Sequence, residues 1–368
     1  MRILVSGAGM AGLSAGINLG ATGHDVTIVE RAGHLRVNGS PIDIRGDAID
    51  VAAEMGVLDE IRKRRVTMTA RTQFVDADGN VLAELPGGEV SDSDDDIEIP
   101  REELAHVLHG ALGPSTSLVF GESVEELHDE GDRVAVTFVS GRREHFDLVV
   151  GADGMHSLTR RLTFGPEREY LEHLGFYVAL TSLPAERGTD LKNPILNWPG
   201  HMIGITRYND VALGVLNFRS PWIDYDYRDL AAQRQILLDA YADHDEWRVP
   251  AILDAVRNDP ELYFDSVSQI KMPTWHRGRI VLIGDAAHCA SGLSGRGASL
   301  ALTGAWLLAL ALQNRPHDLD AAFRDYEANQ RPYVTHAQAS AGPGGDLVVP
   351  ATQEALDARN ERLRAAAS

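Results

Sequence analysis

Three short segments, far apart in the chain, each follow directly after a run of aliphatic and β-branched residues. They are residues 7–12 (GAGMAG), 151–154 (GADG) and 284–288 (GDAAH). A strand that ends in a glycine-bearing turn is typical of parallel α/β sheets, in which such turns gather at one edge. The pattern therefore predicts that the three segments form a single site.

The first segment has the features of a dinucleotide-binding turn. Gly7 allows a tight strand-to-helix turn, Gly9 lets the backbone approach a pyrophosphate, and Gly12 brings the following helix close to the strand. Glu30 ends the next apolar run, where a carboxylate can accept hydrogen bonds from an adenosine ribose. With Ala11 in the turn and a helix after it, the segment favours a dinucleotide site over a structural turn.

The order of the three segments resembles that of a known enzyme family. Residues 151–160 extend the second segment to Gly-Ala-Asp-Gly-x-x-Ser-x-x-Arg, and Pro100-Arg101-x-x-Leu104 stands at the head of an expected helix. This set resembles the class A (single-component) FAD-dependent aromatic hydroxylases of the p-hydroxybenzoate hydroxylase type, over nearly the whole chain. The residues that we expect to bind FAD are Gly7, Gly9, Ala11, Gly12, Glu30, Arg31, Arg36, Arg45, Arg101, Asp153, Gly154, Gly284, Asp285, Gly295, Arg296 and Gly297.

The resemblance also implies a mechanism. NAD(P)H would reduce FAD, and the reduced flavin would react with O2 to form a C4a-hydroperoxide that hydroxylates an aromatic or polycyclic molecule. Asp285 would bind the ribityl chain, and the backbone of residues 295–297 would direct a helix N-terminus at the pyrimidine edge of the flavin. Reduced flavin is negative near N1, and a helix N-terminus carries about half a positive charge. The sequence has no second glycine motif for the nicotinamide, so NADH and NADPH are not distinguished.

Two positions depart from the family pattern. Gly292 stands where relatives usually have proline, and Gly304-Ala305 stands where they usually have Asp-Ala. The first lies in the expected oxygen-activation loop, formed by Gly292, Leu293, Ser294 and Gly295. These departures leave open a second function, a flavin-binding protein that shields or slowly oxidises a reactive pathway intermediate. A flavin halogenase is less favoured, because none of the five tryptophans lies in a Trp-x-Trp-x-Ile-Pro motif.

Composition limits the partners and the setting. The net charge of −20 argues against nucleic acid and anionic membranes, so anionic cofactors would depend on helix termini and local arginines. Cys289 is the only cysteine, and the chain starts without an apolar leader, which favours a cytoplasmic protein. The histidines show no metal-ligand spacing. We expect a small aromatic or polyketide-like substrate, O2 as co-substrate, and a monomer or homodimer.

The pattern of strands and helices predicts an α/β fold with two domains and C-terminal helices. A Rossmann-like FAD-binding domain takes residues 1–70, 96–170 and 266–340, and a mostly antiparallel substrate-binding sheet takes 71–95 and 171–265. The tail, 341–368, is helical after a loop at Gly342-Pro343-Gly344-Gly345. Strand residues expected to face the substrate are Tyr177, Asn197, Met202, Asn217 and Phe218, although alternation gives each an even chance of facing inward.

Overall fold

The computed structural model of the 368-residue chain describes residues 1–35, 39–67, 72–86, 93–185 and 192–366. A six-stranded sheet has the order β17-β18-β11-β1-β2-β7. Its strands are β1 (Arg2–Ser6), β2 (Asp25–Glu30), β7 (Thr116–Phe120), β11 (Leu148–Gly151), β18 (Ile280–Leu282) and the antiparallel edge strand β17 (His276–Arg277). The central strands are buried on both faces, which explains their continuous apolar runs.

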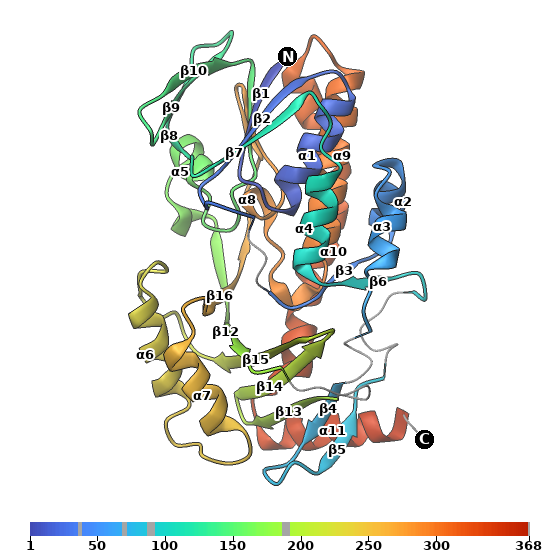
Figure 1. Cartoon of the computed structure of the whole chain (residues 1–368), viewed down its shortest axis with the longest axis vertical. Helices are drawn as coiled ribbons and strands as arrows, with labels where there is room; N and C mark the ends of the chain where they lie inside the picture. Colours follow the sequence, from blue (N-terminus) through green and yellow to red (C-terminus); the bar gives the residue numbers. More distant parts are fainter. Residues whose placement is uncertain (36–38, 68–71, 87–92, 186–191, 367–368) are drawn as a thin grey trace.

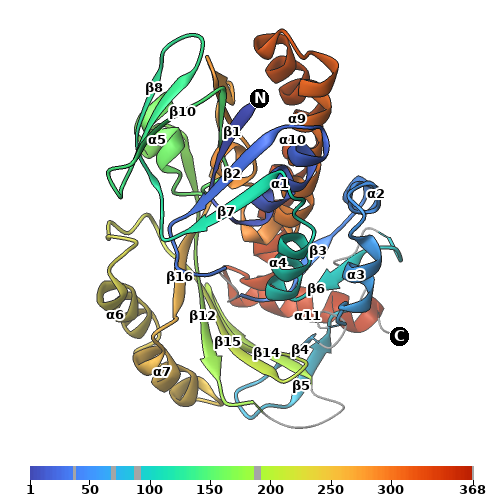
Figure 2. The same ribbon diagram turned by 45° about the horizontal axis from the view of Figure 1, so that its top comes forward.

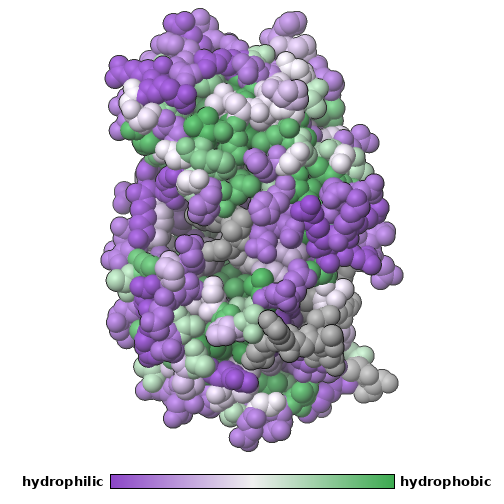
Figure 3. All heavy atoms as spheres, viewed as in Figure 1, coloured by the Kyte–Doolittle hydropathy of each residue, from purple (hydrophilic) through white to green (hydrophobic). Residues whose placement is uncertain are grey.

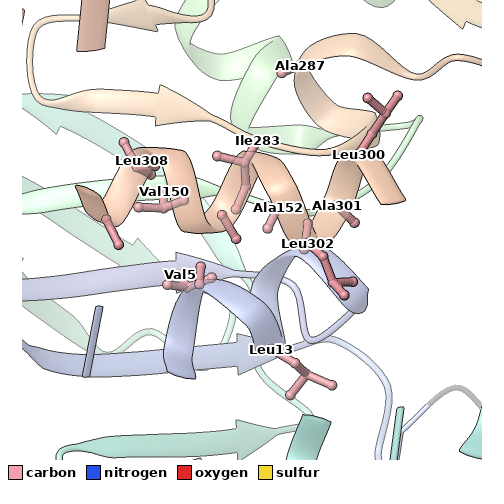
Figure 4. Close-up of a cluster of buried hydrophobic side chains, with 14 of the residues drawn as sticks. Val5, Leu13, Val150, Ala152, Ile283, Ala287, Leu300, Ala301, Leu302 and Leu308 are labelled. Carbon is pink, nitrogen blue, oxygen red and sulfur yellow. The ribbon is translucent and has the colours of Figure 1, made fainter. Parts of the chain in front are cut away.

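Helices cover one face of this sheet and a small sheet covers the other (Figure 1). The helices are α1 (Met10–Ala21), α4 (Arg101–Gly110), α9 (Gly297–Asn314) and α10 (Leu319–Val348), and the small sheet is β8 (Val124–Asp129), β9 (Val134–Phe138) and β10 (Arg143–Phe146). In Figure 4, Val5, Val150 and Ile283 of the sheet pack against Leu302 and Leu308 of α9. Most of α9 is buried, so its apolar composition serves the core, whereas hydrophilic residues cover much of the surface in Figure 3.

Shorter elements complete this domain. They are β3 (Ile42–Ile44) paired with β6 (Ile97–Ile99), α2 (Asp47–Glu54), α3 (Leu58–Lys63), α5 (Leu158–Phe164), α8 (Asp285–His288) and the 3₁₀ helices Glu167–Glu169 and η4 (Gly292–Ser294). In α1, Gly16 lies against Ile28 and Thr116, where an added Cβ would come within 2.7 Å of the Ile28 side chain. The glycines of α1 therefore provide close packing, as the sequence indicates.

A second sheet of seven strands lies below the first in the view of Figure 1. Its order is β16 (Tyr263–Ile270), β12 (Leu171–Leu183), β15 (Val211–Arg219), β14 (His201–Tyr208), β13 (Asn193–Trp198), β4 (Thr72–Val75) and β5 (Val81–Glu84). Only the β4–β13 pair is parallel among these described strands. The hairpin β4–β5 thus joins the second sheet, as predicted. One face packs under α6 (Leu230–Ala240) and α7 (Val249–Asn258), and Figure 2 shows these helices on the side away from α10.

The C-terminal region corrects one expectation. α11 (Gln353–Ala366) forms as predicted, but the segment expected as a loop at residues 342–345 is part of α10, which continues for 30 residues to Val348. Tertiary packing overrides the low helix propensity of glycine and proline here. An added Cβ on Gly345 would lie 2.7 Å from the Phe176 ring, so the missing side chain lets the helix approach the second sheet.

Candidate functional site

The three glycine-bearing turns meet at one edge of the first sheet. Strand register places Ser6 opposite Gly151, and Gly151 opposite Leu282. An added Cβ on Gly7 would lie 2.5 Å from the carbonyl oxygen of Ala152, and one on Gly284 would lie 2.7 Å from the Cβ of Ala11. Both glycines also have positive φ, +106° and +57°. The turns are therefore in direct contact, and only glycine fits at these two positions.

The first turn exposes the N-terminus of α1. Gly9 is the N-cap, and within the described ranges no side chain caps the helix and no acidic residue stands in its first turn. Gly12 needs the absence of a side chain most, since an added Cβ would lie 1.9 Å from the carbonyl oxygen of Gly7. The helix N-terminus therefore keeps donors and partial positive charge for an anion.

Glu30 is fixed beside this turn at the end of β2. Its two carboxylate oxygens accept hydrogen bonds from the backbone N–H groups of Ala8 and Ala32, each at 2.9 Å. A carboxylate offers about four acceptor positions, so Glu30 retains capacity for ribose hydroxyls. Arg31 follows it and is exposed.

Asp285 lies where the third turn begins α8, next to the other two turns. It begins α8, and its side chain is accessible to solvent while Ala286, Ala287 and His288 are buried. The surrounding protein raises the pKa of Asp285, and the positive charge of Arg101 partly offsets this shift. Arg101 is also exposed and is the first residue of α4. The carboxylate of Asp285 is accessible to solvent but has protein around it and an arginine nearby. It is therefore a suitable partner for the hydroxyl groups of a cofactor.

The second turn has mainly an organising role. Asp153 accepts hydrogen bonds from the Ser157 hydroxyl at 2.5 Å and from the Thr159 N–H at 2.9 Å, which fixes the start of α5. Gly154, with φ +81°, makes the turn between them. The buried side chain of Arg160 donates to the carbonyl of Ala286, at 2.9 Å, and so connects the second turn to the third. Flavin binding by Asp153 itself stays a prediction.

A loop after α8 leads into the N-terminus of α9. Gly295 has the left-handed conformation, with φ +62°, and Arg296 and Gly297 follow at the start of the helix. In the described structure no side chain caps α9, and its first turn has no acidic residue. Arg45 lies against Gly295, 3.3 Å from an added Cβ, and forms an ion pair with Asp43 at 2.7 Å. This end of α9 therefore remains positive, as the sequence predicts.

Arg36, which the sequence predicts to bind FAD, lies outside the described residues. Gly304, in the middle of α9, lies against the buried Gln330 of α10, and an added Cβ would be 3.3 Å from its Nε2. Glycine at residue 304 thus leaves room for the Gln330 side chain between α9 and α10.

Known proteins share this architecture. Residues 1–174 match the family described as FAD binding domain. The chain is 35% identical over 337 residues to a flavin-dependent monooxygenase of Legionella longbeachae, with 91% of this chain and 86% of that protein covered. The chain belongs to the flavin-dependent monooxygenases. Tetracycline destructase Tet(51) superposes on this monooxygenase with a TM-score of 0.86, 32% identity, and 99% and 96% of the two chains covered.

The residues of the site fit FAD. Klebsiella pneumoniae HpxO, solved with FAD and uric acid, shares the fold with a TM-score of 0.75 at 21% identity, over 99% of this chain and 93% of that one. In this monooxygenase the free N-terminus of α1 suits a pyrophosphate, Glu30 a ribose, and Asp285 with Arg101 the hydroxyl and phosphate groups between them. The uncapped N-terminus of α9 suits the pyrimidine edge of the flavin.

The expected substrate residues of the monooxygenase separate onto two faces of the second sheet. Met202 lies in an apolar cluster with Phe176, Val267 and Leu293 of the loop, and the amide nitrogen of Asn217 lies 4.0 Å from the Met202 sulfur. These two residues are on the face toward the FAD-binding domain. This face is the candidate substrate side, and a substrate contact of Met202 or Asn217 stays a prediction.

The structure corrects the expectation for Tyr177 and Phe218. Tyr177 is fully buried between Phe218 and Phe264, with ring centroids 5.4 and 5.5 Å away, in the cluster under α6 and α7. Its hydroxyl accepts a hydrogen bond from the N–H of Ile223 at 2.7 Å. Both aromatic side chains thus belong to the core on the far face of the sheet, because alternation along a strand does not reveal which face is inside.

Asn197 has a different role from the one expected. Its amide nitrogen donates to the carbonyls of His201 and Val348, at 3.1 and 2.9 Å, and its oxygen accepts from Arg359 at 2.9 Å. The side chain therefore joins β13 to the end of α10 and to α11. Its hydrogen-bonding capacity is largely used within the protein.

One charged residue of the site region gave no signal in the sequence. His156, two residues after Gly154, lies 2.9 Å from Glu167 and 3.3 Å from Asp265, and stacks on Tyr227 at 4.1 Å between ring centroids. Burial alone would lower its pKa, but hydrogen bonds and the charges of the two carboxylates raise the pKa to about 10. His156 is therefore an imidazolium that joins the two domains, and only the folded chain brings its partners together.

Proposed function

We propose that this monooxygenase uses NAD(P)H and O2 to hydroxylate an aromatic or polycyclic, polyketide-like small molecule. The observation that carries the proposal is the placement of the apolar face with Met202 and Val267 next to the loop that follows Asp285. A flat apolar ring system bound beside the flavin would lie next to this cluster. The likeness to a tetracycline destructase, at 32% identity over 99% of the chain, supports a polycyclic substrate.

The protein's part in this reaction is binding, orientation and control of charge. Bound FAD would supply the redox chemistry that transfers electrons from the nicotinamide to O2. The N-terminus of α1, Glu30, Arg101 and Asp285 would hold the cofactor, and the N-terminus of α9 would stabilise negative charge that develops on its ring. The apolar face of the second sheet would keep water from the reacting carbon.

His288 is not a proton donor for the site. It follows Ala287 in α8, is almost fully buried, and packs on Trp275 with ring centroids 4.6 Å apart. Burial lowers its pKa to about 3, so the ring is neutral at physiological pH. The packing of His288 in the core is a sufficient reason for this residue, and no catalytic role is needed to explain it.

Substrate-stimulated oxidation of NADH and NADPH tests the proposal. The holoprotein is mixed with a panel of phenols, quinones and polyketides that includes a tetracycline, and both H2O2 and products are measured. We expect at least one polycyclic compound to accelerate NAD(P)H oxidation and to gain one oxygen atom. A holoprotein whose FAD is reduced by neither nicotinamide would contradict the proposal.

The open space at Gly292 favours one alternative, a flavin protein that shields or slowly oxidises a reactive intermediate. Among the described residues, nothing lies within 4 Å of a Cβ added there. A loosely held loop would suit binding better than fast oxygen transfer. Tight binding of a polycyclic compound, without acceleration of NAD(P)H oxidation and without an oxygenated product, would support this alternative.

A further inference from the structure

The loop between α8 and α9, residues 289–296, combines hydrogen bonds of its own, such as that from the Leu293 N–H to the Ser291 hydroxyl at 3.1 Å, with a strained backbone. Ser291 has φ +81° and ψ 148°, a backbone region that almost only glycine occupies. Gly292 has open space around it in the described structure, and Gly295 has the left-handed conformation. A strained conformation persists only where the surrounding structure holds it. Contacts from outside the loop must therefore add to its own hydrogen bonds.

The end of α10 supplies these contacts. An added Cβ on Gly344 would lie 2.4 Å from the carbonyl oxygen of Leu293, in the middle of the loop. An added Cβ on Gly345 would lie 3.1 Å from the Leu293 side chain and 2.7 Å from the ring of Phe176. The helix thus holds both the backbone and the side chain of Leu293. Any side chain at residue 344 would push the loop backbone away.

The second sheet fixes this end of α10 in turn. Arg219 donates from Nε to the carbonyl of Val349 at 2.7 Å, pairs with Asp346 at 2.6 Å, and places its guanidinium 4.2 Å from the centre of the Phe176 ring. A continuous set of contacts therefore runs from β12 and β15, through the end of α10, to Leu293. The loop is positioned from the substrate-facing sheet.

We propose that Gly344 is a positioning residue for the loop at the N-terminus of α9, because its missing side chain sets the distance between α10 and the Leu293 carbonyl. Gly344 acts through Leu293 and touches no reacting atom. The inference rests on the proposed function only in that the loop borders the flavin. Contacts with Leu293 and Phe176 account for the presence of glycine at residues 344 and 345 within a helix.

Substitution of two glycines on the same helix tests the inference. Gly344→Ala adds a methyl group against Leu293, whereas Gly342→Ala, the matched control, adds it where no described atom lies within 4 Å. Both gain the same helix propensity. We expect Gly344→Ala to raise the FAD dissociation constant about tenfold and to change the visible circular dichroism of bound FAD. Gly342→Ala should leave both within about twofold and raise the Tm.

Equal FAD affinity and equal flavin spectra in the two variants would overturn the inference, even if Gly344→Ala lowered the Tm. If Gly344→Ala does not yield folded protein, Arg219→Met decides, because it frees the end of α10 without adding atoms to the contact. We expect it to raise the FAD dissociation constant about threefold. An unchanged constant overturns the inference.

Anaerobic mixing of the wild-type holoprotein with NADH and NADPH, in the presence of the same panel of compounds, separates this result from the proposed function. A flavin that stays oxidised with every compound would contradict the monooxygenase reaction. The comparison of FAD affinities would still decide the role of Gly344, since it requires no turnover.

Discussion

The two sheets of this protein both approach the candidate site, but different kinds of contact determine their structures. The first is parallel, buried on both faces, and ends in turns whose glycines touch neighbouring backbone. The second is mostly antiparallel, packs α6 and α7 on one face, and on the other holds Met202 in a buried apolar cluster beside Leu293. Backbone contacts therefore determine the turns of the cofactor side, whereas side-chain packing determines the second sheet. A methyl group added to a closely packed glycine should move the turns, whereas a substitution on the second sheet should act through side-chain contacts.

The strongest test of this contrast is Gly12→Ala. The added Cβ would lie 1.9 Å from the Gly7 carbonyl, so the turn must move, at a cost of about 3 kcal/mol in the free energy of unfolding. We expect loss of FAD and a lower midpoint in urea unfolding. Gly9→Ala is the control, since no described atom lies within 4 Å of its Cβ. It should preserve apoprotein stability and weaken only FAD binding, and equal stability losses in the two variants would break the contrast.

Asp285→Asn tests the cofactor side without changing its shape. Loss of one charge-assisted hydrogen bond costs about 1.5–3 kcal/mol, which raises the FAD dissociation constant about ten- to a hundredfold. Titration of apoprotein with FAD measures it. Asp50→Asn, on the exposed surface of α2, is the control and should bind FAD normally. Unchanged affinity in Asp285→Asn would mean that the third turn does not contact the cofactor through this carboxylate.

On the second sheet, Tyr177→Phe and Met202→Ala should differ in their effect on the substrate. Tyr177→Phe leaves the partly buried N–H of Ile223 without its acceptor, which lowers the free energy of unfolding by about 1–3 kcal/mol and leaves the KM for substrate unchanged. Met202→Ala should also lower the free energy of unfolding, because Met202 is buried, but should in addition change KM or product pattern at unchanged FAD affinity. Denaturant unfolding and steady-state kinetics distinguish them. A changed product pattern in Tyr177→Phe would return this residue to the substrate side.

The His156 contact between the domains should make stability fall at alkaline pH. Its pKa is raised from 6.5 to about 10 in the folded protein, so its stabilising contribution is complete below about pH 6.5 and is lost as the pH rises through 10. Tm measured between pH 6 and 10 should fall more steeply for wild type than for His156→Asn. Parallel curves would show that the imidazolium contributes nothing to the junction.

The smallest expected effect is that of Gly292→Pro. Gly292 is the first residue of η4 and is not among the glycines with positive φ, so proline fits its place. Proline should stabilise the protein by about 0.4–1 kcal/mol and lower the H2O2 released per NAD(P)H consumed. If wild type and variant release equal amounts, Gly292 does not affect oxygen chemistry.

The sequence predicted the cofactor side in detail because its residues are dictated by backbone contacts. Gly7, Gly12 and Gly284 occupy positions that no other residue can take, so they are visible in the sequence as motifs. For the substrate side, the sequence predicted a mostly antiparallel sheet but not which side chains lie on which face. Tyr177 and Phe218 were placed on the wrong face, since alternation has the same period on both faces.

Contacts between residues that are distant in the sequence could not be predicted, because they depend on tertiary structure. The pairing of His156 with Asp265 depends on how the two domains meet, and that of Asn197 with Arg359 on how α11 packs on the second sheet. The helical state of residues 342–345 likewise depends on contacts with Phe176 and Leu293, which local propensity opposes. Such features follow from tertiary structure and leave no local pattern.

The strand order β18-β11-β1 has a consequence for biosynthesis. Adjacent strands in the centre of the first sheet come from the start, the middle and the last quarter of the chain. A ribosome therefore releases residues 2–6 long before their neighbours at 280–282, and the nascent protein has no complete nucleotide pocket until synthesis is nearly finished. Non-local strand pairing of this kind is slow. We expect cofactor loading to be a late step, after release of the chain, with cellular FAD supply setting the yield of mature enzyme.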